Sequence, residues 1–450
     1  MNDDRKDMPN GFRDTPLGPL PEDWQVVRLG EVIALIRNGL TKRQAKDGHG
    51  IPVSRIETIA DGTIDFSRVG YVSDLSQSEI DKYALRDGDI LFSHINSEPM
   101  LGKTAVYRKY MPTLIHGMNL LLIRSRQNLY LSEFANYQFQ FLRSKGVFMG
   151  LAARAVGQAS INQGKLKSLE IPLPPLSEQC AIAQVLSTIQ RAIEATERVI
   201  AAARELKKSL MRHLFTYGPV PPSEAESVPL RETEIGPLPV HWQVVRLGDV
   251  AEVRAGVAFP YKYQGATAGK YPFYKVADMN TPGNEKYMQH SHNWIDDDLL
   301  IKLKANLFPK LTVVFPKVGG ALLTNKKRLL SQDSLVDNNI MGVMLQKGKN
   351  EFIPEYCFYW FESIDIRKFS NPGPLPSINA QAIKQAPIPL PPLPEQQRIA
   401  EILQVVDAKI QAEENRKAAL QSLFKSMLHR LMTGKVQLSW EFITRFKEDR

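Results

Sequence analysis

Two segments of the chain carry the apolar spacing of a long helix. In residues 178–215, apolar side chains recur alternately four and three positions apart, at Ile182, Leu186, Ile189, Ile193, Ile200, Ala203, Leu210 and Leu214. Thr196 and Lys207 interrupt this stripe. Such a repeat predicts a coiled-coil helix, and its 38 residues would extend over about 57 Å at 1.5 Å per residue.

The second segment repeats the first 217 residues later. Its apolar positions are Ile399, Leu403, Val406, Ile410, Leu420, Phe424, Met427 and Leu431, with Glu413 and Lys417 as interruptions. The equal lengths and matched stripes predict that the two helices pair antiparallel. The predicted seam consists of Ile182, Leu186, Ile189, Ile193, Ile399, Leu403, Val406 and Ile410. The alternative is two independent helices, each capping its own domain.

Helix-end chemistry marks both segments. Ser177 is a good N-cap residue, and Pro394 at the equivalent position suits the first helical turn. Glu178 opposes the positive end of its helix dipole, as does its counterpart in the second segment. Gly218 and Gly434 are expected to end the helices.

The regions around these helices are also duplicated. Gly18-Pro19-Leu20-Pro21, Trp24 and Val27-Arg28-Leu29-Gly30 return 218 residues later, from Gly236 to Gly248. A second block returns after 217 residues: Ser160-Ile161-Asn162, Pro172-Leu173-Pro174-Pro175-Leu176 and Glu178-Gln179 reappear as Ser377-Ile378-Asn379, Pro389-Leu390-Pro391-Pro392-Leu393 and Glu395-Gln396. The chain therefore contains two copies of one unit.

Between the blocks the two copies share pattern rather than identity. Residues 89–92 and 312–315 read as buried strands, and Ser132 and Pro354 each open an aromatic-rich helix. This pattern predicts an α/β fold with an internal two-fold pseudo-repeat, in which two similar globular domains carry different surfaces. The expected boundaries are domains at 18–174 and 236–391, helices at 175–217 and 392–434, a linker at 218–235, a polar N-terminal tail at 1–17 and a C-terminal tail at 435–450.

Composition narrows the class of protein. The hydrophobic fraction of 43% and charged fraction of 23% suit packed domains and exclude a wholly disordered chain. Only Cys180 and Cys357 occur, which argues against a disulfide framework. The polar N-terminus and short apolar runs favour a cytoplasmic protein without a signal peptide or membrane span. The net charge of +9 suits a polyanionic partner such as nucleic acid.

Motifs for catalysis are missing from the sequence. It contains no Gly-x-Gly-x-x-Gly or Walker loop, and no Asn/Asp-Pro-Pro-Tyr/Phe motif for base methylation. The acidic-x-Lys triplets ending at Lys207 and Lys409 are interpreted as solvated helix faces, and His290 and His292 lack a third ligand nearby. We therefore predict no catalytic and no metal-binding residue.

Basic, amide and tyrosine side chains in the expected loops are the candidates for DNA contact. Arg and Lys pair with guanine edges or phosphates, Asn with adenine edges, and Tyr can stack. The candidates are Arg37, Thr41, Lys42, Arg43, Asn96 and Lys103 in the first domain, and Tyr263, Lys275, Lys317, Asn325 and Lys326 in the second. Arg37-Asn38-Gly39 and its counterpart Arg254-Ala255-Gly256 also fit tight turns.

The duplicated blocks resemble the conserved regions of specificity (S) subunits of Type I restriction-modification systems, over nearly the whole chain. The resemblance implies two target-recognition domains, each reading half of a bipartite site in double-stranded DNA. It also implies that the paired helices set the spacer and dock two methyltransferase (M) subunits. By the same resemblance, S-adenosylmethionine belongs to the M subunit, ATP and Mg belong to the restriction (R) subunits, and the S subunit itself is non-catalytic.

Two other functions remain open on the sequence. A coiled-coil scaffold could join proteins without touching nucleic acid, in which case no methyltransferase gene is expected beside this one. An enzyme with an unrecognised site would methylate or cleave DNA as an isolated chain. The recognition domains match the family too weakly for any base-contacting residue to be carried over.

Overall fold

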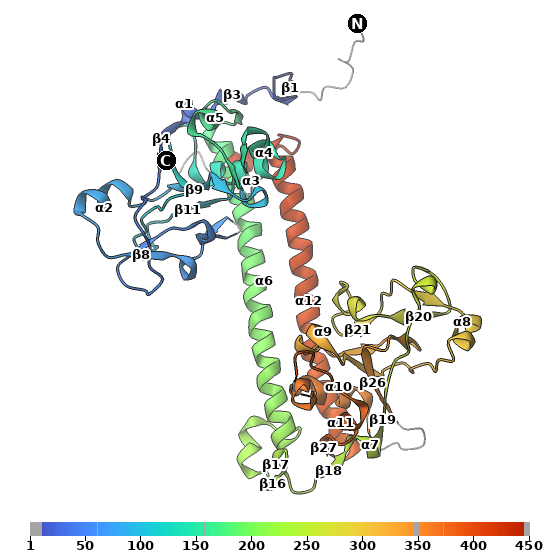
Figure 1. Ribbon diagram of the computed structural model, residues 1–450. Helices are drawn as coiled ribbons and strands as arrows, with labels where there is room; N and C mark the ends of the chain where they lie inside the picture. Colours follow the sequence, from blue (N-terminus) through green and yellow to red (C-terminus); the bar gives the residue numbers. More distant parts are fainter. Residues whose placement is uncertain (1–10, 61, 156–157, 346–351, 372, 445–450) are drawn as a thin grey trace. The chain divides into compact units, whose positions relative to one another are not determined.

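The computed structural model describes residues 11–60, 62–155, 158–345, 352–371 and 373–444. Parts of the two predicted tails, residues 1–10 and 445–450, lie outside this range. The chain divides into a first unit, residues 1–196 and 416–450, and a second unit, residues 197–415. Two long helices, α6 (Leu176–Tyr217) and α12 (Leu393–Met432), each contribute residues to both units (Figure 1).

The first unit combines short strands with short helices. Its strands are β1 (Phe12–Arg13), β2 (Leu20–Pro21), β3 (Gln25–Arg28), β4 (Ile33–Asn38), β5 (Ile51–Val53), β6 (Ile59–Ala60), β7 (Thr63–Ile64), β8 (Gly70–Val72), β9 (Ile90–Ser93), β10 (Ile95–Asn96), β11 (Thr104–Val106), β12 (Leu120–Ser125), β13 (Ala153–Ala155), β14 (Gln158–Ser160) and β15 (Glu170–Leu173). Its helices, besides part of the long pair, are α1 (Leu29–Val32), η1 (Ile56–Thr58), η2 (Phe66–Arg68), α2 (Gln77–Tyr83), η3 (Glu98–Met100), α3 (Ser132–Ser144), α4 (Val147–Leu151), α5 (Gln163–Lys167) and α13 (Trp440–Thr444).

The second unit has the same kind of composition. Its strands are β16 (Leu230–Thr233), β17 (Gly236–Pro239), β18 (Gln243–Arg246), β19 (Ala251–Ala255), β20 (Tyr271–Tyr274), β21 (Tyr287–Met288), β22 (Trp294–Ile295), β23 (Val313–Pro316), β24 (Arg328–Leu330), β25 (Leu335–Val336), β26 (Ile340–Leu345) and β27 (Pro387–Leu390). Its helices are η4 (Pro222–Ser227), α7 (Leu247–Val250), η5 (Tyr261–Tyr263), η6 (Val276–Asn280), α8 (Asp297–Lys302), α9 (Gly319–Leu323), α10 (Pro354–Ser363), η7 (Ile366–Phe369) and α11 (Ala380–Lys384).

In each unit the two repeated sequence blocks contact each other. Strand β3 pairs antiparallel with β15 in the first unit, and β18 pairs antiparallel with β27 in the second. A guanidinium N–H of Arg13 donates to the carbonyl of Trp24 at 2.6 Å, and Arg231 donates to the carbonyl of Trp242 at 2.7 Å. The duplicated residues therefore build one frame twice.

The sheets inserted into this frame differ between the units. The main sheet of the first unit has the order β11-β9-β12-β4, whereas that of the second has β19-β26-β23-β24-β21. The aromatic helix packs beside each sheet, α3 through Phe139 against Phe92 and α10 through Phe361 against Phe315. The predicted strands at 89–92 and 312–315 are confirmed as β9 and β23, each shifted by one residue.

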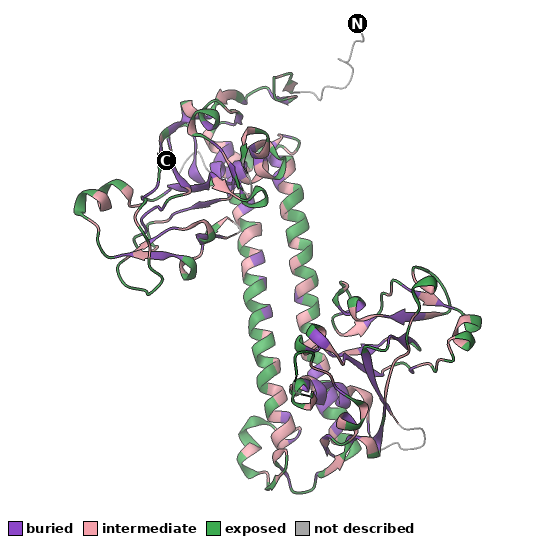
Figure 2. Ribbon diagram, in the orientation of Figure 1, coloured by how far each residue is buried: buried purple, intermediate pink, exposed green. Residues whose placement is uncertain are grey.

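Both units contain antiparallel helix packing. In the first unit Leu186, near the start of α6, shares a core with Leu428 near the end of α12. In the second unit Leu214, near the end of α6, shares a core with Leu403 near the start of α12. Figure 2 shows buried residues gathered in the sheets and in the parts of the helices beside them. The predicted antiparallel pair is confirmed.

The helix boundaries differ slightly from those expected. Helix α6 has 42 residues and begins at Leu176, so Ser177 lies in the first turn and is not the N-cap; the amide of Gln179 already donates to the carbonyl of Pro175 at 2.9 Å. Gly218 and Gly434 follow the helices with φ values of +83° and +65°, which confirms them as helix stops.

The expected tight turns at Gly39 and Gly256 are replaced by a close approach between backbones. A Cβ atom at Gly39 would lie 1.9 Å from the carbonyl oxygen of Gly117, and one at Gly256 would lie 2.0 Å from that of Val336. Neither glycine has a positive φ. Glycine is required here because the strand end passes directly against a neighbouring segment.

Candidate nucleic-acid interface

The first group of candidates follows strand β4. Lys42 forms an ion pair with Glu79 at 3.0 Å and donates to the carbonyl of Asp74 at 2.5 Å, so its ammonium group ties the loop to α2. Thr41 and Arg43, on either side of it, are exposed. The loop is therefore anchored by its middle residue and presents its neighbours to solvent.

A second group lies beside β9. Asn96 belongs to β10, which pairs with β14, and the last residue of β14 is Ser160 of the repeated Ser160-Ile161-Asn162. Its side-chain amide donates to the hydroxyl of Ser93 at 3.0 Å, and its oxygen accepts from the amide of Ser97 at 2.8 Å. Asn96 thus shapes its own loop. Lys103 is half-buried and directly precedes β11.

The second unit gathers an aromatic and basic surface around η5. The ammonium groups of Lys262 and Lys302 lie 5.0 and 5.4 Å from the ring centre of Tyr263. A hydrogen bond from Lys302 lowers the pKa of the Tyr263 phenol, and a hydrogen bond from Lys262 lowers it by a smaller amount. Tyr261 beside them is 89% exposed. Stacking rings next to cations are the components of a nucleic-acid surface. Lys302 was not among the sequence candidates because it sits in a helix rather than a loop.

Lys275 lies next to this surface, since its ammonium group donates to the side-chain oxygen of Gln264 at 2.8 Å. Gln264 directly follows η5. The structure therefore brings two predicted residues, Tyr263 and Lys275, to the same part of the second unit. Lys317 is half-buried elsewhere in this unit, where its carbonyl accepts from Ile378 in the repeated Ser-Ile-Asn block at 2.8 Å.

Asn325 supports the fold. It has a φ of +54°, and its side-chain oxygen accepts from the ammonium of Lys327 at 2.9 Å and from the amide of Ile366 at 3.0 Å. Burial lowers the pKa of Lys327 to about 8, while Glu362 and Asp365 act in the opposite direction. Lys326, half-buried next to it, donates to the side-chain oxygen of Asn280.

Each acidic-x-Lys triplet on the helices is solvated at only one of its two charged residues: Glu205 and Lys409 are exposed as expected, but Lys207 and Asp407 are not. In the second unit Asp407 pairs with Lys207 and with Lys286, both at 2.7 Å, and accepts from the hydroxyl of Tyr359 at 2.7 Å. Burial raises the pKa of Asp407, but the lysines outweigh it and leave the pKa below its ordinary value. This network joins α6, α12 and α10. It is structural and suggests no nuclease site.

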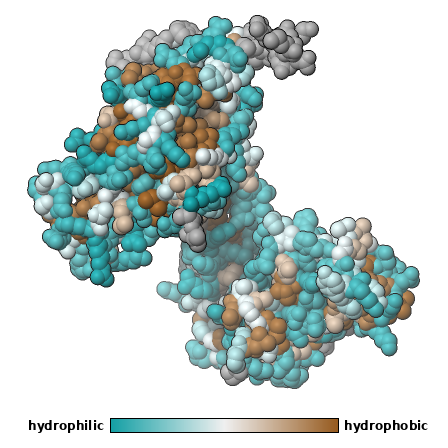
Figure 3. All heavy atoms as spheres, turned by 45° about the horizontal axis from the view of Figure 1, so that its top comes forward, coloured by the Kyte–Doolittle hydropathy of each residue, from teal (hydrophilic) through white to brown (hydrophobic). Residues whose placement is uncertain are grey.

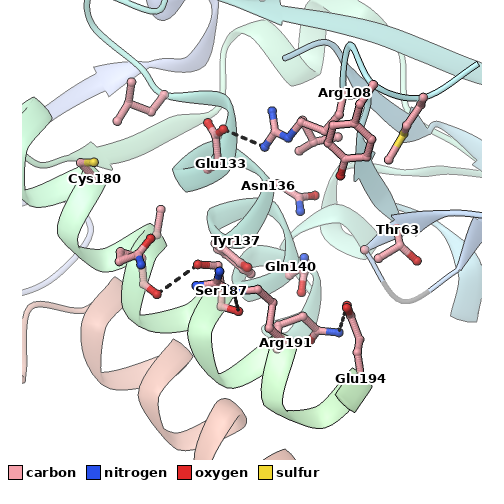
Figure 4. A pocket seen from close by; sticks show the side chains of 18 of the residues that line it. Thr63, Arg108, Glu133, Asn136, Tyr137, Gln140, Cys180, Ser187, Arg191 and Glu194 are labelled. Carbon is pink, nitrogen blue, oxygen red and sulfur yellow. Dashed lines mark hydrogen bonds and ion pairs between the residues drawn. The ribbon is translucent and has the colours of Figure 1, made fainter. Parts of the chain in front are cut away.

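A hollow of about 580 Å³ lies in the first unit between α3 and the first half of α6 (Figure 4). Arg108 and Glu133 form an ion pair at 2.7 Å on one side, and Arg191 and Glu194 extend from α6 on the other. Charges of both signs line it. Such a surface suits a polar protein partner better than a polyanion.

No metal or membrane feature emerges from the described part of the chain. His292 binds Asp278 at 2.5 Å, and the described residues contain no group of three or more His, Cys, Asp or Glu side chains placed to hold a metal. None of the described helices is both long and apolar enough to cross a membrane. Hydrophilic side chains make up most of the face in Figure 3.

Comparison with known proteins identifies the frame. The family model for the Type I restriction modification DNA specificity domain matches residues 21–204 and again 239–422. The chain therefore belongs to this family and carries its domain twice. The family membership confirms the expectation from the repeated blocks and favours DNA specificity over a scaffold without nucleic acid.

One relative matches nearly the whole chain and another matches less than half of it. The putative type I restriction enzyme MjaX specificity subunit of Methanocaldococcus jannaschii is 35% identical over 435 residues, covering 95% of this chain and 97% of the relative. The EcoKI specificity subunit of Escherichia coli K12 is 26% identical over 214 residues, or 44% of this chain and 46% of the relative.

Solved structures share the fold. The crystal structure of a Type-I restriction-modification S subunit from M. genitalium has a TM-score of 0.57 at 14% identity, covering 96% of this chain and 99% of that one. A chain from a structural study of complex assembly in a type I R-M system has a TM-score of 0.54 at 19% identity, covering 93% and 99%.

Proposed function

We propose that this chain selects the DNA sequence for a Type I restriction-modification complex, each unit reading one half of a bipartite duplex site. One observation carries the proposal. The same frame occurs twice, and the segments inserted into it differ both in sequence and in sheet order. This arrangement suits two domains that bind DNA in the same way but recognise different half-sites, because the shared frame keeps the fold and the differing inserts provide different contact surfaces.

The long helices have two roles in this proposal. Helices of 42 and 40 residues are stiff, so they fix the distance between the half-sites and leave the bases between them unread. Their polar outer faces, including the lining of the hollow beside α6, dock two M subunits, and R subunits join through these. The M subunits supply S-adenosylmethionine chemistry and the R subunits use ATP and Mg, while this chain holds no cofactor.

Affinity and specificity come from different contacts. Lysine and arginine side chains neutralise phosphates and give most of the affinity, which falls as salt rises. Base contacts select the sequence, and the exposed loop around Arg43 and the Tyr261–Tyr263 surface are the parts of the two units best placed to make them. The predicted contact residues themselves remain predictions.

Footprinting of the complex with the M subunit tests this function. We expect two protected patches about one helical turn (~34–36 Å) or slightly more apart. Randomising one half-site should abolish specific protection, whereas changing the bases between the patches at constant length should not. A single uninterrupted footprint, or protection indifferent to both half-sites, would contradict the proposal.

A further inference from the structure

A basic hollow of about 360 Å³ opens in the first unit beside the main sheet. Four cationic side chains line it: Arg37 from β4, Lys82 from α2, Arg86 just after α2, and Arg124 from β12. One of them, Arg37, was already a candidate from the sequence. The other three come together only through the fold.

A buried carboxylate holds this hollow in shape. Asp89, whose side chain is fully buried, accepts two hydrogen bonds from the guanidinium of Arg124, both at 2.7 Å. It also accepts from the backbone amide of Arg86 at 2.7 Å. The guanidinium of Arg37 donates to the carbonyl of Lys82 at 2.5 Å, which joins β4 to the end of α2. The cations are therefore set on a rigid base.

Four cations and two acids leave half of this positive charge uncompensated. Asp89 neutralises Arg124, and Asp81, the other acid at the hollow, accepts from the side chain of Gln77 at 2.8 Å. Lys82 contacts the ring of Tyr83 at 5.1 Å. Within the described residues, neither the Lys82 ammonium nor the Arg86 guanidinium has a hydrogen bond or ion pair. Exposed cations held close together favour an anionic ligand.

We propose that this hollow binds a phosphodiester group of the target DNA backbone. The guanidinium of Arg37 keeps further N–H groups beyond the one bonded to Lys82, and arginine forks match the oxygens of a phosphate. A contact of this kind carries no sequence information but fixes the position of the first unit on the duplex. The inference rests on the proposed function and adds to it the anchor for one recognition domain.

The test uses the assembled complex with the M subunit and the Arg86→Gln and Lys82→Gln variants. Both side chains are exposed, so folding should be retained and is checked by thermal unfolding. Arg68→Gln is the matched control, because Arg68 is an exposed arginine of the same unit that pairs with Asp65 outside the hollow. For each hollow variant we expect weaker binding to cognate and non-cognate duplexes alike, and a salt slope smaller by about one ion.

Neutral phosphates in the DNA identify the ligand. Methylphosphonates placed singly along one half-site should weaken binding by the wild-type complex at one position, and that loss should disappear in Arg86→Gln. Unchanged binding by Arg86→Gln and Lys82→Gln, or an altered methylated sequence, would overturn the assignment. Binding of inorganic phosphate by the wild-type chain without any effect of these variants on DNA affinity would also overturn it. Failure of the wild-type complex to recognise a bipartite site would instead contradict the proposed function.

Discussion

The indole N–H of Trp24 donates a hydrogen bond of 2.9 Å to the carboxylate of Glu178, and both groups are buried. Trp24 belongs to the first repeated block and Glu178 to the first turn of α6. The second unit repeats the contact between Trp242 and Glu395 at 2.8 Å, where His241 also binds the carboxylate at 2.8 Å. This pair fastens each frame to the start of its long helix.

Removing the indole donor should therefore destabilise the first unit. Trp24→Phe keeps an aromatic ring but leaves the buried Glu178 carboxylate without this partner, which should lower the free energy of unfolding by about 1–3 kcal/mol. Trp242→Phe is the matched comparison and should cost less, because Glu395 retains His241. Urea unfolding followed by circular dichroism measures both. Equal losses of unfolding free energy would show that removing the donor to Glu178 costs no more than removing the donor to Glu395.

Stability should also depend on the protonation of Glu178. Burial raises the pKa of this carboxyl from an ordinary 4.5 to about 7, although the bond from Trp24 lowers it and Asp23 raises it further. Between pH 4.5 and 7 the folded state holds a proton that the unfolded state has lost. The stabilisation is complete below pH 4.5 and is lost as the pH rises through 7.

Glu178→Gln isolates this effect because glutamine can still accept from the indole. The difference in unfolding free energy between wild type and variant should shift in favour of the variant from pH 5 to about pH 7 and level off by pH 8. A difference that stays constant over this range would mean that Glu178 does not titrate there.

A carboxylate placed in either helix core should be strongly destabilising. Leu186 in the first unit and Leu403 in the second are fully buried, so Leu186→Asp and Leu403→Asp each bury an unpaired charge and should cost several kcal/mol. We also expect assembly with the M subunit to fail. Gln184→Asp and Val405→Asp are the controls for stability, since Gln184 is exposed and Val405 is 70% exposed. If Leu186→Asp and Leu403→Asp matched wild type in size-exclusion chromatography and urea unfolding, the burial of these leucines in the helix cores would be contradicted.

The Asp407 network should contribute to the stability of the second unit. Asp407→Asn removes the charge shared by Lys207 and Lys286, and we expect a loss of about 3 kcal/mol because both lysines are largely buried. Asp365→Asn is the control, since Asp365 pairs with Arg367 at an exposed position. The two variants should differ clearly in urea midpoint. Similar urea midpoints would mean that the ion pairs of Asp407 contribute no more to stability than the exposed pair of Asp365.

The sequence predicts the frame well because its repeated residues contact each other. Trp24, Glu178 and the strands β3 and β15 all lie in the duplicated blocks, so their repetition reflects shared packing. The apolar stripe likewise predicts which helix residues lie in the cores, since Leu186 and Leu403 are buried as expected. Predicted seam residues farther along the helices, namely Ile189, Val406 and Ile410, are only half-buried, while Ile193 is buried; Ile182 and Ile399 join the cores.

Polar side chains that find partners inside the fold limit what the sequence can predict. Thr196 and Glu413 interrupt the stripe yet are only 3% and 6% exposed, because Thr196 bonds to the carbonyl of Ala192 and Glu413 pairs with Lys409. The pairing of Arg124 with Asp89 has no local signal, since 35 residues separate them. The sequence does not predict the basic hollow, because the hollow depends on this distant pair. Asn325 is a candidate for DNA contact only because asparagine can bind adenine, whereas in the structure its side chain bonds to the backbone of Ile366.

Exchange of one insert tests the central claim most directly. Residues 40–155 are replaced by the equivalent segment of another specificity subunit, and the chain is expressed with its M subunit for single-molecule mapping of DNA methylation. We expect one half of the methylated site to change to that of the donor, while the other half and the spacer stay the same. A change in both halves, or a methylated site identical to that of the unaltered chain, would contradict the account.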